Sequence, residues 1–405
     1  SVVAMLRVEL RKARPGMSLA LPVMNPKLPG HELLKAGYEL TPAIIEKLED
    51  LSVRTLWVDY PSLALLENFI DRHTMEKQLH VVSQIKDTFE TLQGESNAKL
   101  DFDTYTQNIG SLVETVMCNP GAAIFVGDLC QHDDNQQMMR HSSTVTYLSL
   151  LMGLKLEGYL VKQRRHVSGD RAGDVTNLGL GAMLHDVGVT MLPAEVAKRY
   201  EETGDDSDPA WREHPALGFA MVRGKIDPTA AAVVLHHHQR YDGTGYAGQD
   251  FPVQSGDSIH IFPRIVAVAD LFARLRHPSK QPERPAAAVL AAMLSPKVRK
   301  RFDPNVVRAL IEVVPPYPPG AQVKLSSGAT AVVIDHNLID PCRPTVKMMP
   351  DGDLPIGDTK LVPTVNLAEQ IDELQIIACD DIATHRFNFK PEAIPGHREA
   401  IHGWV

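Results

Sequence analysis

The chain has 405 residues, of which 44% are hydrophobic and 22% are charged, and its formal net charge at pH 7 is −9. This composition is that of a globular protein, and the negative charge excludes a general attraction to DNA or RNA polymers. No apolar run has transmembrane length, and the start of the chain lacks the pattern of a signal peptide. The four cysteines form no CxxC pair, so we expect no disulfide framework or zinc–thiolate site and a cytoplasmic protein.

Residues 1–60 predict a small α+β domain. Residues 6–10 alternate apolar and charged side chains, which is the period of a strand. Thr41 and Pro42 are typical of a helix N-cap and the first helical position that follows it. Residues 55–58 then predict a further strand.

The rest of the chain predicts a helical linker, a helical core and a β appendage. Helical periodicity over residues 61–120 indicates the linker, whose helices could mediate a homodimer. The same periodicity dominates residues 121–314, where we expect the core. Prolines then end the helical pattern, and short alternating segments in residues 315–405 predict a small β appendage and tail. The expected fold class is therefore multidomain and mainly α, with an all-α core between two smaller units.

Histidines and aspartates stand at apolar positions of the predicted helical core. His185 and Asp186 lie within one apolar stretch, and Asp270 lies within another. A buried carboxylate without a partner costs several kcal/mol, and a bound metal ion would compensate it. An isolated His–Asp pair is more often a satisfied structural feature, so the remaining positions decide between the two interpretations.

Further histidines follow the same pattern. His141 shares a helical stripe with apolar residues, and His214 precedes Pro215 in an N-cap and N1 arrangement. His237 and His238 end an apolar run, and neighbouring helical residues diverge by about 100°, so they could serve two metal ions or two sides of one cluster. This many inward-facing positions in one domain favour a divalent metal centre over chance polarity in a core.

These motifs resemble the HD-GYP family, which belongs to the HD superfamily of metal-dependent phosphohydrolases. The matching segments are HDVG at 185–188, EHPALG at 213–218 and HHQRYDGTGYA at 237–247, together with Asp270 in VAVADLF. The resemblance covers roughly residues 121–314 and implies an HD-type helical core. The N-terminal sixty residues, with their RPGM sequence, are similar to a small domain found ahead of some family members.

The resemblance implies a cyclic di-GMP phosphodiesterase with two divalent metal ions, commonly iron or manganese. The metal ligands it implies are His141, His185, Asp186, His214, His237, His238 and Asp270. Asp186 would be the bridging and catalytic carboxylate, and a metal-activated hydroxide would open the phosphodiester to give pGpG, or GMP after a second cut. The family also implies a diguanylate cyclase or another signalling protein as a partner.

Several family positions are altered in this sequence. Gln137 replaces a glutamate that binds a third metal in some members, which favours two ions over three. Val189, Gln239 and Ala247 replace a lysine, a glutamate and a proline of the family motifs. Loss of a positioned lysine charge can cost a few kcal/mol in the transition state.

The candidates for substrate contact are Tyr246, Asp242, Arg276 and Lys280. The family's phosphate-binding arginine and lysine would fall on Ser279 and Pro282, and Arg276 or Lys280 could replace them. A solvated basic loop is the competing interpretation, and Tyr246 could equally pack within a turn. Two alternatives to the phosphodiesterase therefore stand. One is a degenerate module that binds metal and nucleotide, or a signalling partner, with little turnover; the other is an HD-type hydrolase of another nucleotide or phosphate ester.

Overall fold

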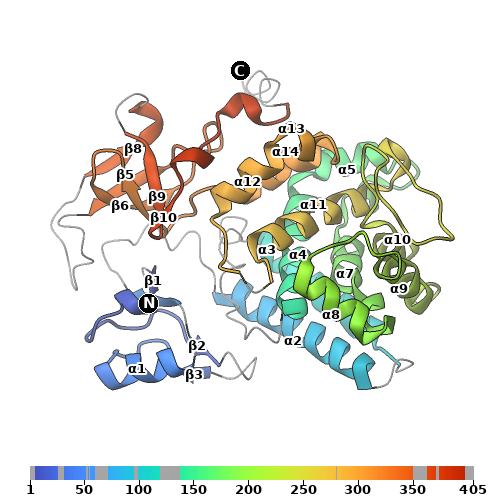
Figure 1. The fold of residues 1–405 in the computed structure, drawn as a ribbon, viewed down its shortest axis with the longest axis horizontal. Helices are drawn as coiled ribbons and strands as arrows, with labels where there is room; N and C mark the ends of the chain where they lie inside the picture. The colour runs from blue at the N-terminus through green and yellow to red at the C-terminus, as the bar shows by residue number, and fades with distance from the viewer. Residues whose placement is uncertain are drawn as a thin grey trace.

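The structure is a computed structural model that describes residues 5–25, 32–51, 53, 55–59, 72–94, 99–118, 137–279, 281–349, 363–370 and 374–396. The protein is multidomain and mainly α, as the sequence predicts. An all-α core lies beside a small N-terminal α+β unit and a C-terminal β-sheet (Figure 1). Among the described helices, none is long and apolar enough to cross a membrane.

The N-terminal unit contains two short antiparallel strand pairs and one helix. Strand β1 (Met5–Glu9) pairs with β4 (Thr55–Asp59), and β2 (Val23–Met24) pairs with β3 (Glu32–Leu34). Helix α1 (Pro42–Asp50) begins at the predicted cap, where the Thr41 hydroxyl accepts a hydrogen bond from the Ile44 amide. The predicted helix start is therefore confirmed.

The core is built from the helices that follow. They are α2 (Arg72–Gly94), α3 (Phe102–Cys118), α4 (Gln137–Lys155), α5 (Glu157–Gln163), α6 (Gly169–Gly173), α7 (Thr176–Leu184), α8 (Ala194–Thr203), α9 (His214–Val222), α10 (Pro228–His236), α11 (Ile261–Arg276), α12 (Ala286–Leu294), α13 (Pro296–Arg299) and α14 (Pro304–Val313). Two 3₁₀ turns, η5 (Val187–Met191) and η6 (Trp211–Glu213), lie before α8 and α9.

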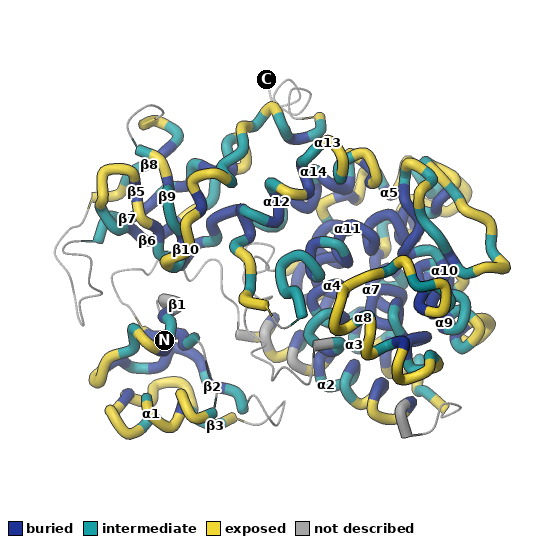
Figure 2. The backbone as a smooth tube through the Cα atoms, in the orientation of Figure 1, coloured by how far each residue is buried: buried dark blue, intermediate teal, exposed yellow. Residues whose placement is uncertain are grey.

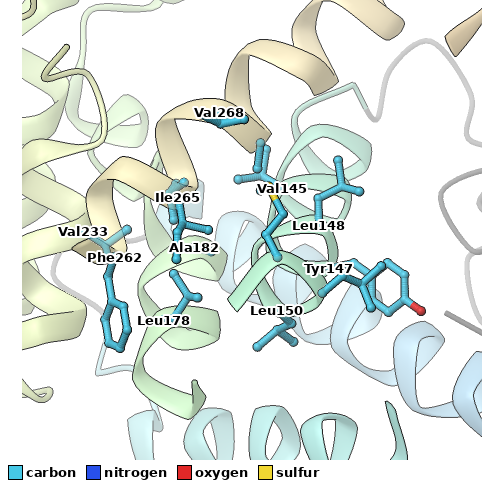
Figure 3. Packing of buried hydrophobic residues seen from close by; sticks show 14 of the residues in the cluster. Val145, Tyr147, Leu148, Leu150, Leu178, Ala182, Val233, Phe262, Ile265 and Val268 are labelled. Atoms are coloured by element: carbon cyan, nitrogen blue, oxygen red, sulfur yellow. The ribbon is translucent and has the colours of Figure 1, made fainter. Parts of the chain in front are cut away.

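Helices α4, α7, α10 and α11 form the centre of this core. Figure 3 shows Val145 of α4, Leu178 of α7, Val233 of α10 and Ile265 of α11 within one hydrophobic cluster, and each is fully buried. Helices α2 and α3 contribute to the same hydrophobic cluster. The α11 backbone is buried along most of its length, whereas α8 is largely exposed (Figure 2). Burial on this scale fixes the backbone from which any inward-facing polar side chain projects.

The C-terminal unit is a six-stranded sheet. Its strands β5 (Gln322–Leu325), β6 (Thr330–Asp335), β7 (Thr345–Met349), β8 (Thr364–Asn366), β9 (Ile376–Cys379) and β10 (Ile382–Ala383) lie in the order β10-β9-β5-β6-β7-β8. The described neighbours pair antiparallel. The first three strands were predicted from alternation. The sequence does not predict β9 and β10, and β10 has only two residues, which are too few to show a period.

The two small units pack against each other, as Figure 1 also shows. Val332 and Ile334 of β6 belong to the hydrophobic cluster of the N-terminal unit. Asp381 adds ion pairs with Arg11 at 3.0 Å and with Lys12 at 2.7 Å. Apolar packing with β6 and ion pairs with Asp381 therefore join the N-terminal unit to the C-terminal sheet.

His260 caps the first turn of α11, which carries Asp270. Its Nδ1 accepts a hydrogen bond from the Phe262 amide at 3.3 Å. Burial, together with the nearby charges of Arg164 and Arg264, lowers the pKa of His260 to about 4. In the unfolded chain the pKa of a histidine is about 6.5. Between about pH 4 and about pH 6.5, the unfolded chain therefore binds more protons at this histidine than the folded chain does. The stability contributed by His260 is thus complete above about pH 6.5 and is lost as the pH falls toward about 4.

A His260→Asn variant should separate this titration from the cap itself. Asparagine is a good N-cap that carries no titrating group. We expect its midpoint of thermal unfolding to fall less than that of the wild type between about pH 7.5 and about pH 5. Every other histidine is present in both proteins, so the difference between the two pH dependences reports on His260. Identical dependences would show that His260 does not contribute.

Candidate metal centre

The seven predicted ligands come together inside the helical core. They are His141 on α4, His185 and Asp186 directly after α7, His214 at the start of α9, His237 and His238 directly after α10, and Asp270 on α11. The sequence predicts His214 as an N-cap, and this detail is wrong. Glu213 is the N-cap, because η6 already has helical backbone angles and runs directly into α9.

Asp186 lies between two pairs of imidazoles. Its Oδ2 is 3.2 Å from Nε2 of His185 and 3.7 Å from Nε2 of His141. Its Oδ1 is 3.3 Å from Nε2 of His214 and 3.5 Å from Nε2 of His237. Each carboxylate oxygen therefore faces a different pair of histidines.

The donor atoms form two groups that could each hold a metal ion. One group contains Asp186, His214, His237 and His238, and the other contains His141, His185 and Asp186. Within each group the donor atoms all lie within 4.8 Å of one another. Asp186 is the residue that both groups share, so its position is that of a bridging carboxylate.

Backbone carbonyls fix the direction in which three of these imidazoles present their lone pairs. Nδ1 of His185, His214 and His237 lies 2.7–2.9 Å from the carbonyl oxygens of the residues three positions earlier. An Nδ1 beside a carbonyl carries the proton, so Nε2 presents a lone pair to the centre. Nε2 of His214 and Nε2 of His237 lie 3.3 Å apart. Two lone pairs that face each other beside a carboxylate oxygen fit a cation bound between them.

The protonation states of Asp186, His237 and His238 suit a metal ion. Burial would lower the pKa of His185, but the charges of Asp186 and Asp270 raise it. Burial alone would raise the pKa of Asp186, but the neighbouring imidazoles, His185 foremost, hold it well below the ordinary value. Burial lowers the pKa of His237 to about 4, and burial together with the neighbouring histidines and arginines holds that of His238 well below the ordinary value. Neither ring nitrogen of His238 has a hydrogen-bond partner among the described residues. Ionised carboxylates and neutral imidazoles are the forms that bind metals.

Asp270 connects the two groups. Its Oδ1 is 3.2 Å from Nε2 of His141, and its Oδ2 is 4.0 Å from Nδ1 of His238. Arg274, one helical turn further along α11, donates a hydrogen bond to the same Oδ2. Burial would raise the pKa of Asp270, but the charge of Arg274 and the contact with His141 lower it. Asp270 therefore stays ionised as a candidate ligand.

Comparisons with known proteins place this centre in a family. A family model described as "HD domain" matches residues 135–306. This part of the chain is similar to the HD domain family. The chain is 27% identical over 244 residues to the cyclic di-GMP phosphodiesterase PA4108 of Pseudomonas aeruginosa, covering 59% of this chain and 54% of that protein. It is 34% identical over 143 residues to the cyclic di-GMP phosphodiesterase response regulator RpfG of Xanthomonas campestris pv. campestris, covering 34% and 36%.

A solved structure is also similar. It is Bd1817, a HDG"Y"P protein from Bdellovibrio bacteriovorus, with a TM-score of 0.43, 17% identity and coverage of 76% of this chain and 98% of that one. The chain spans about half of the PA4108 sequence and about a third of RpfG. The family resemblance predicted from the motifs is confirmed, and the His/Asp cluster of this HD domain could bind metal.

The HD domain brings one of the four predicted substrate residues to the cluster. The Tyr246 ring stacks on His238, with ring centroids 4.7 Å apart. Asp242 is exposed and accepts hydrogen bonds from the amide and hydroxyl of Thr244, which shapes the local turn. Arg276 pairs with Glu283. Lys280 lies outside the described residues.

The altered family positions have local structural roles. Val189 is buried in an apolar cluster that includes Trp211. Gln239 donates to the Pro252 carbonyl at 3.1 Å and accepts from the Gln254 amide at 3.0 Å, which ties down the loop after α10. Ala247 is buried as well. These side chains stabilise the loops around the centre and bring no charge to it.

Sequence reasoning missed three residues that surround the centre. Arg274 donates to Asp270, and its other terminal nitrogen donates to the Tyr200 hydroxyl at 2.7 Å. Tyr200 stacks on Trp211 with centroids 3.6 Å apart, and the Trp211 carbonyl orients His214. The available signal was the spacing of four residues from Asp270 to Arg274, which places two helical side chains side by side.

Proposed function

We propose that this chain is a metal-dependent phosphodiesterase that hydrolyses cyclic di-GMP to pGpG, or to GMP after a second cut. The observation that carries the proposal is the placement of Asp186, whose two oxygens face separate pairs of imidazoles. That arrangement supports two divalent ions, iron or manganese in our proposal. The substrate is proposed from the names of the curated relatives.

The residues divide the task of holding the ions. His214, His237 and His238 would hold one ion with Oδ1 of Asp186, and His141 and His185 would hold the other with Oδ2. Asp270, which lies close to both groups, would complete the set. Two divalent cations bound there supply Lewis acidity toward water and toward phosphoryl oxygens.

The chain itself orients the ligands and leaves one side of the centre accessible. The side chains of Asp186 and His141 are each 14% exposed, whereas His185, His214 and His237 are fully buried. A phosphodiester would therefore approach the cluster beside Asp186 and His141. Tyr246 is the substrate contact we favour over Asp242 and Arg276, because its ring lies on His238 while the other two side chains make contacts away from the ligands.

Metal removal tests this function. We expect protein loaded anaerobically with Fe²⁺ or Mn²⁺ to convert cyclic di-GMP to pGpG or GMP, with the products separated by chromatography. Treatment with a chelator should lower the rate at least about 100-fold, because the Lewis acid is lost. Adding back either ion should restore the rate. Metal-loaded protein that binds the nucleotide tightly and forms no product would contradict the proposal.

That last outcome would favour the second candidate, a module that binds metal and nucleotide with little turnover. The burial of Val189 among apolar side chains is the observation in its favour. A positioned cation beside developing charge can contribute a few kcal/mol to a transition state. Hydrolysis of another nucleotide or phosphate ester, with none of cyclic di-GMP, would instead support a different HD-type hydrolase.

A further inference from the structure

Arg274 is a cation within the candidate centre to which the seven-ligand pattern gives no role. Its two terminal nitrogens donate to Asp270 Oδ2 and to the Tyr200 hydroxyl. Its Nε is buried and has no hydrogen-bond partner among the described residues. The side chain as a whole is 23% exposed, so it reaches from the buried carboxylate toward the surface. An arginine carries five N–H donors, and the two contacts leave three of them for another acceptor.

Two more unpaired donors belong to the same part of the site. The Tyr246 hydroxyl and Nε1 of Trp211 are both buried and have no hydrogen-bond partner in the described part of the chain. Tyr246 stacks on His238, and Trp211 stacks on the tyrosine that holds Arg274. A buried donor left unpaired costs about 1–3 kcal/mol. A ligand rich in acceptor oxygens would remove this cost, and a phosphate group is such a ligand.

Two other arginines near the centre, Arg212 and Arg240, make contacts of a different kind. The Arg212 guanidinium lies over the Tyr246 ring, 4.9 Å from its centroid, and donates to the Asp206 carbonyl. Arg240 is buried and donates to the backbone carbonyls of His237 and Gln239. Arg274 differs from both because its guanidinium donates to the carboxylate of a candidate metal ligand, Asp270.

We propose that Arg274 binds a phosphate oxygen of the substrate and supplies the positive charge that Val189 does not. A planar guanidinium can donate two hydrogen bonds to one phosphate, and such charge-assisted bonds are stronger than neutral ones. Asp270 and Tyr200 hold the guanidinium in place, and Tyr200 is a positioning residue in this arrangement. The inference rests on the proposed function only in that the substrate carries a phosphate group.

Binding of inorganic phosphate to metal-loaded protein tests this role directly. We expect Arg274→Gln to raise the dissociation constant for phosphate, measured by isothermal titration calorimetry, by about tenfold or more. Arg274→Lys should raise the dissociation constant less, because the charge is kept while the bidentate geometry is lost. Metal content, measured by elemental analysis, should be equal in all three proteins. If the glutamine variant is insoluble, the phosphate affinity of Arg274→Lys is compared with that of the wild type instead.

The matched control is Arg199→Gln. Arg199 is next to Tyr200 on α8, is mostly exposed and pairs with Asp208 at 2.7 Å, so its loss removes one charge close to the site without touching it. Phosphate affinity should be unchanged in this variant. An equal loss in both glutamine variants would overturn the proposal, because it would reflect net charge alone.

Two further results would also overturn it. One is an unchanged phosphate affinity in metal-loaded Arg274→Gln, and the other is loss of metal from that variant, which would make Arg274 a support for the ligands alone. The outcome for the proposed function is read separately. If wild-type protein hydrolyses no cyclic di-GMP but its phosphate affinity depends on Arg274, the proposed function fails and the role of Arg274 stands.

Discussion

An Asp186→Asn variant is expected to lose both metal ions and to lower phosphodiester hydrolysis by about a thousandfold. Asparagine keeps the shape of the side chain but has no negative charge, and it offers one oxygen where aspartate offers two. Because the two oxygens of Asp186 face different histidine pairs, a single substitution should weaken both donor groups at once. Elemental analysis of the purified variant measures the metal, and a cyclic di-GMP assay measures the rate.

A matched control is Asp101→Asn at the start of α3. Asp101 accepts hydrogen bonds from the amide and hydroxyl of Thr104 in an exposed cap, and asparagine can cap in the same way. Metal content and activity should both be unchanged there. If Asp186→Asn kept two equivalents of metal, the carboxylate would not be a bridge; if it kept one, the carboxylate would serve a single ion.

The clustering of the seven candidate ligands could be predicted from the sequence because local rules place each member. His185 and Asp186 follow an apolar helix directly, and Asp270 lies on a helix that is buried on nearly every side. At such positions a polar side chain must point toward other polar groups. Helical periodicity therefore indicated which residues face inward, and the family motifs indicated which of them meet.

The surroundings of the ligands could not be predicted in the same way. A carboxylate and an arginine four residues apart on a helix are more often an exposed ion pair, so the pattern of Asp270 and Arg274 is ambiguous without the burial of α11. The contact of Arg274 with Tyr200 joins residues 74 positions apart. The same reasoning applies to β9, a four-residue strand that pairs with β5 across a long stretch of sequence. Such contacts depend on tertiary packing and leave no local signal.

A Gly188→Ala variant is expected to destabilise the protein by more than about 3 kcal/mol and to lower its metal content. Gly188 lies in η5 where that turn passes across α9. A Cβ at this position would lie far inside van der Waals contact of the His214 carbonyl oxygen and the Gly218 amide nitrogen, and 2.9 Å from the Cα of Gly218. All three atoms belong to the backbone, so no side-chain rotation relieves the clash. Either η5 or α9 must shift, and these segments carry Asp186 and His214 at their ends.

Gly110→Ala is the matched control for this substitution. Gly110 lies in the middle of α3, and a Cβ there would meet no atom within 4 Å. Alanine has the higher helix propensity, so this variant should be more stable than the wild type by about 0.5–1 kcal/mol. Urea unfolding in the presence of a chelator gives both free energies without any contribution from bound metal. If Gly188→Ala then had the same free energy of unfolding as the wild type, η5 and α9 would not approach each other as closely as described. Metal lost from a Gly188→Ala protein that still folds would instead show that this approach sets the distance between His214 and Asp186.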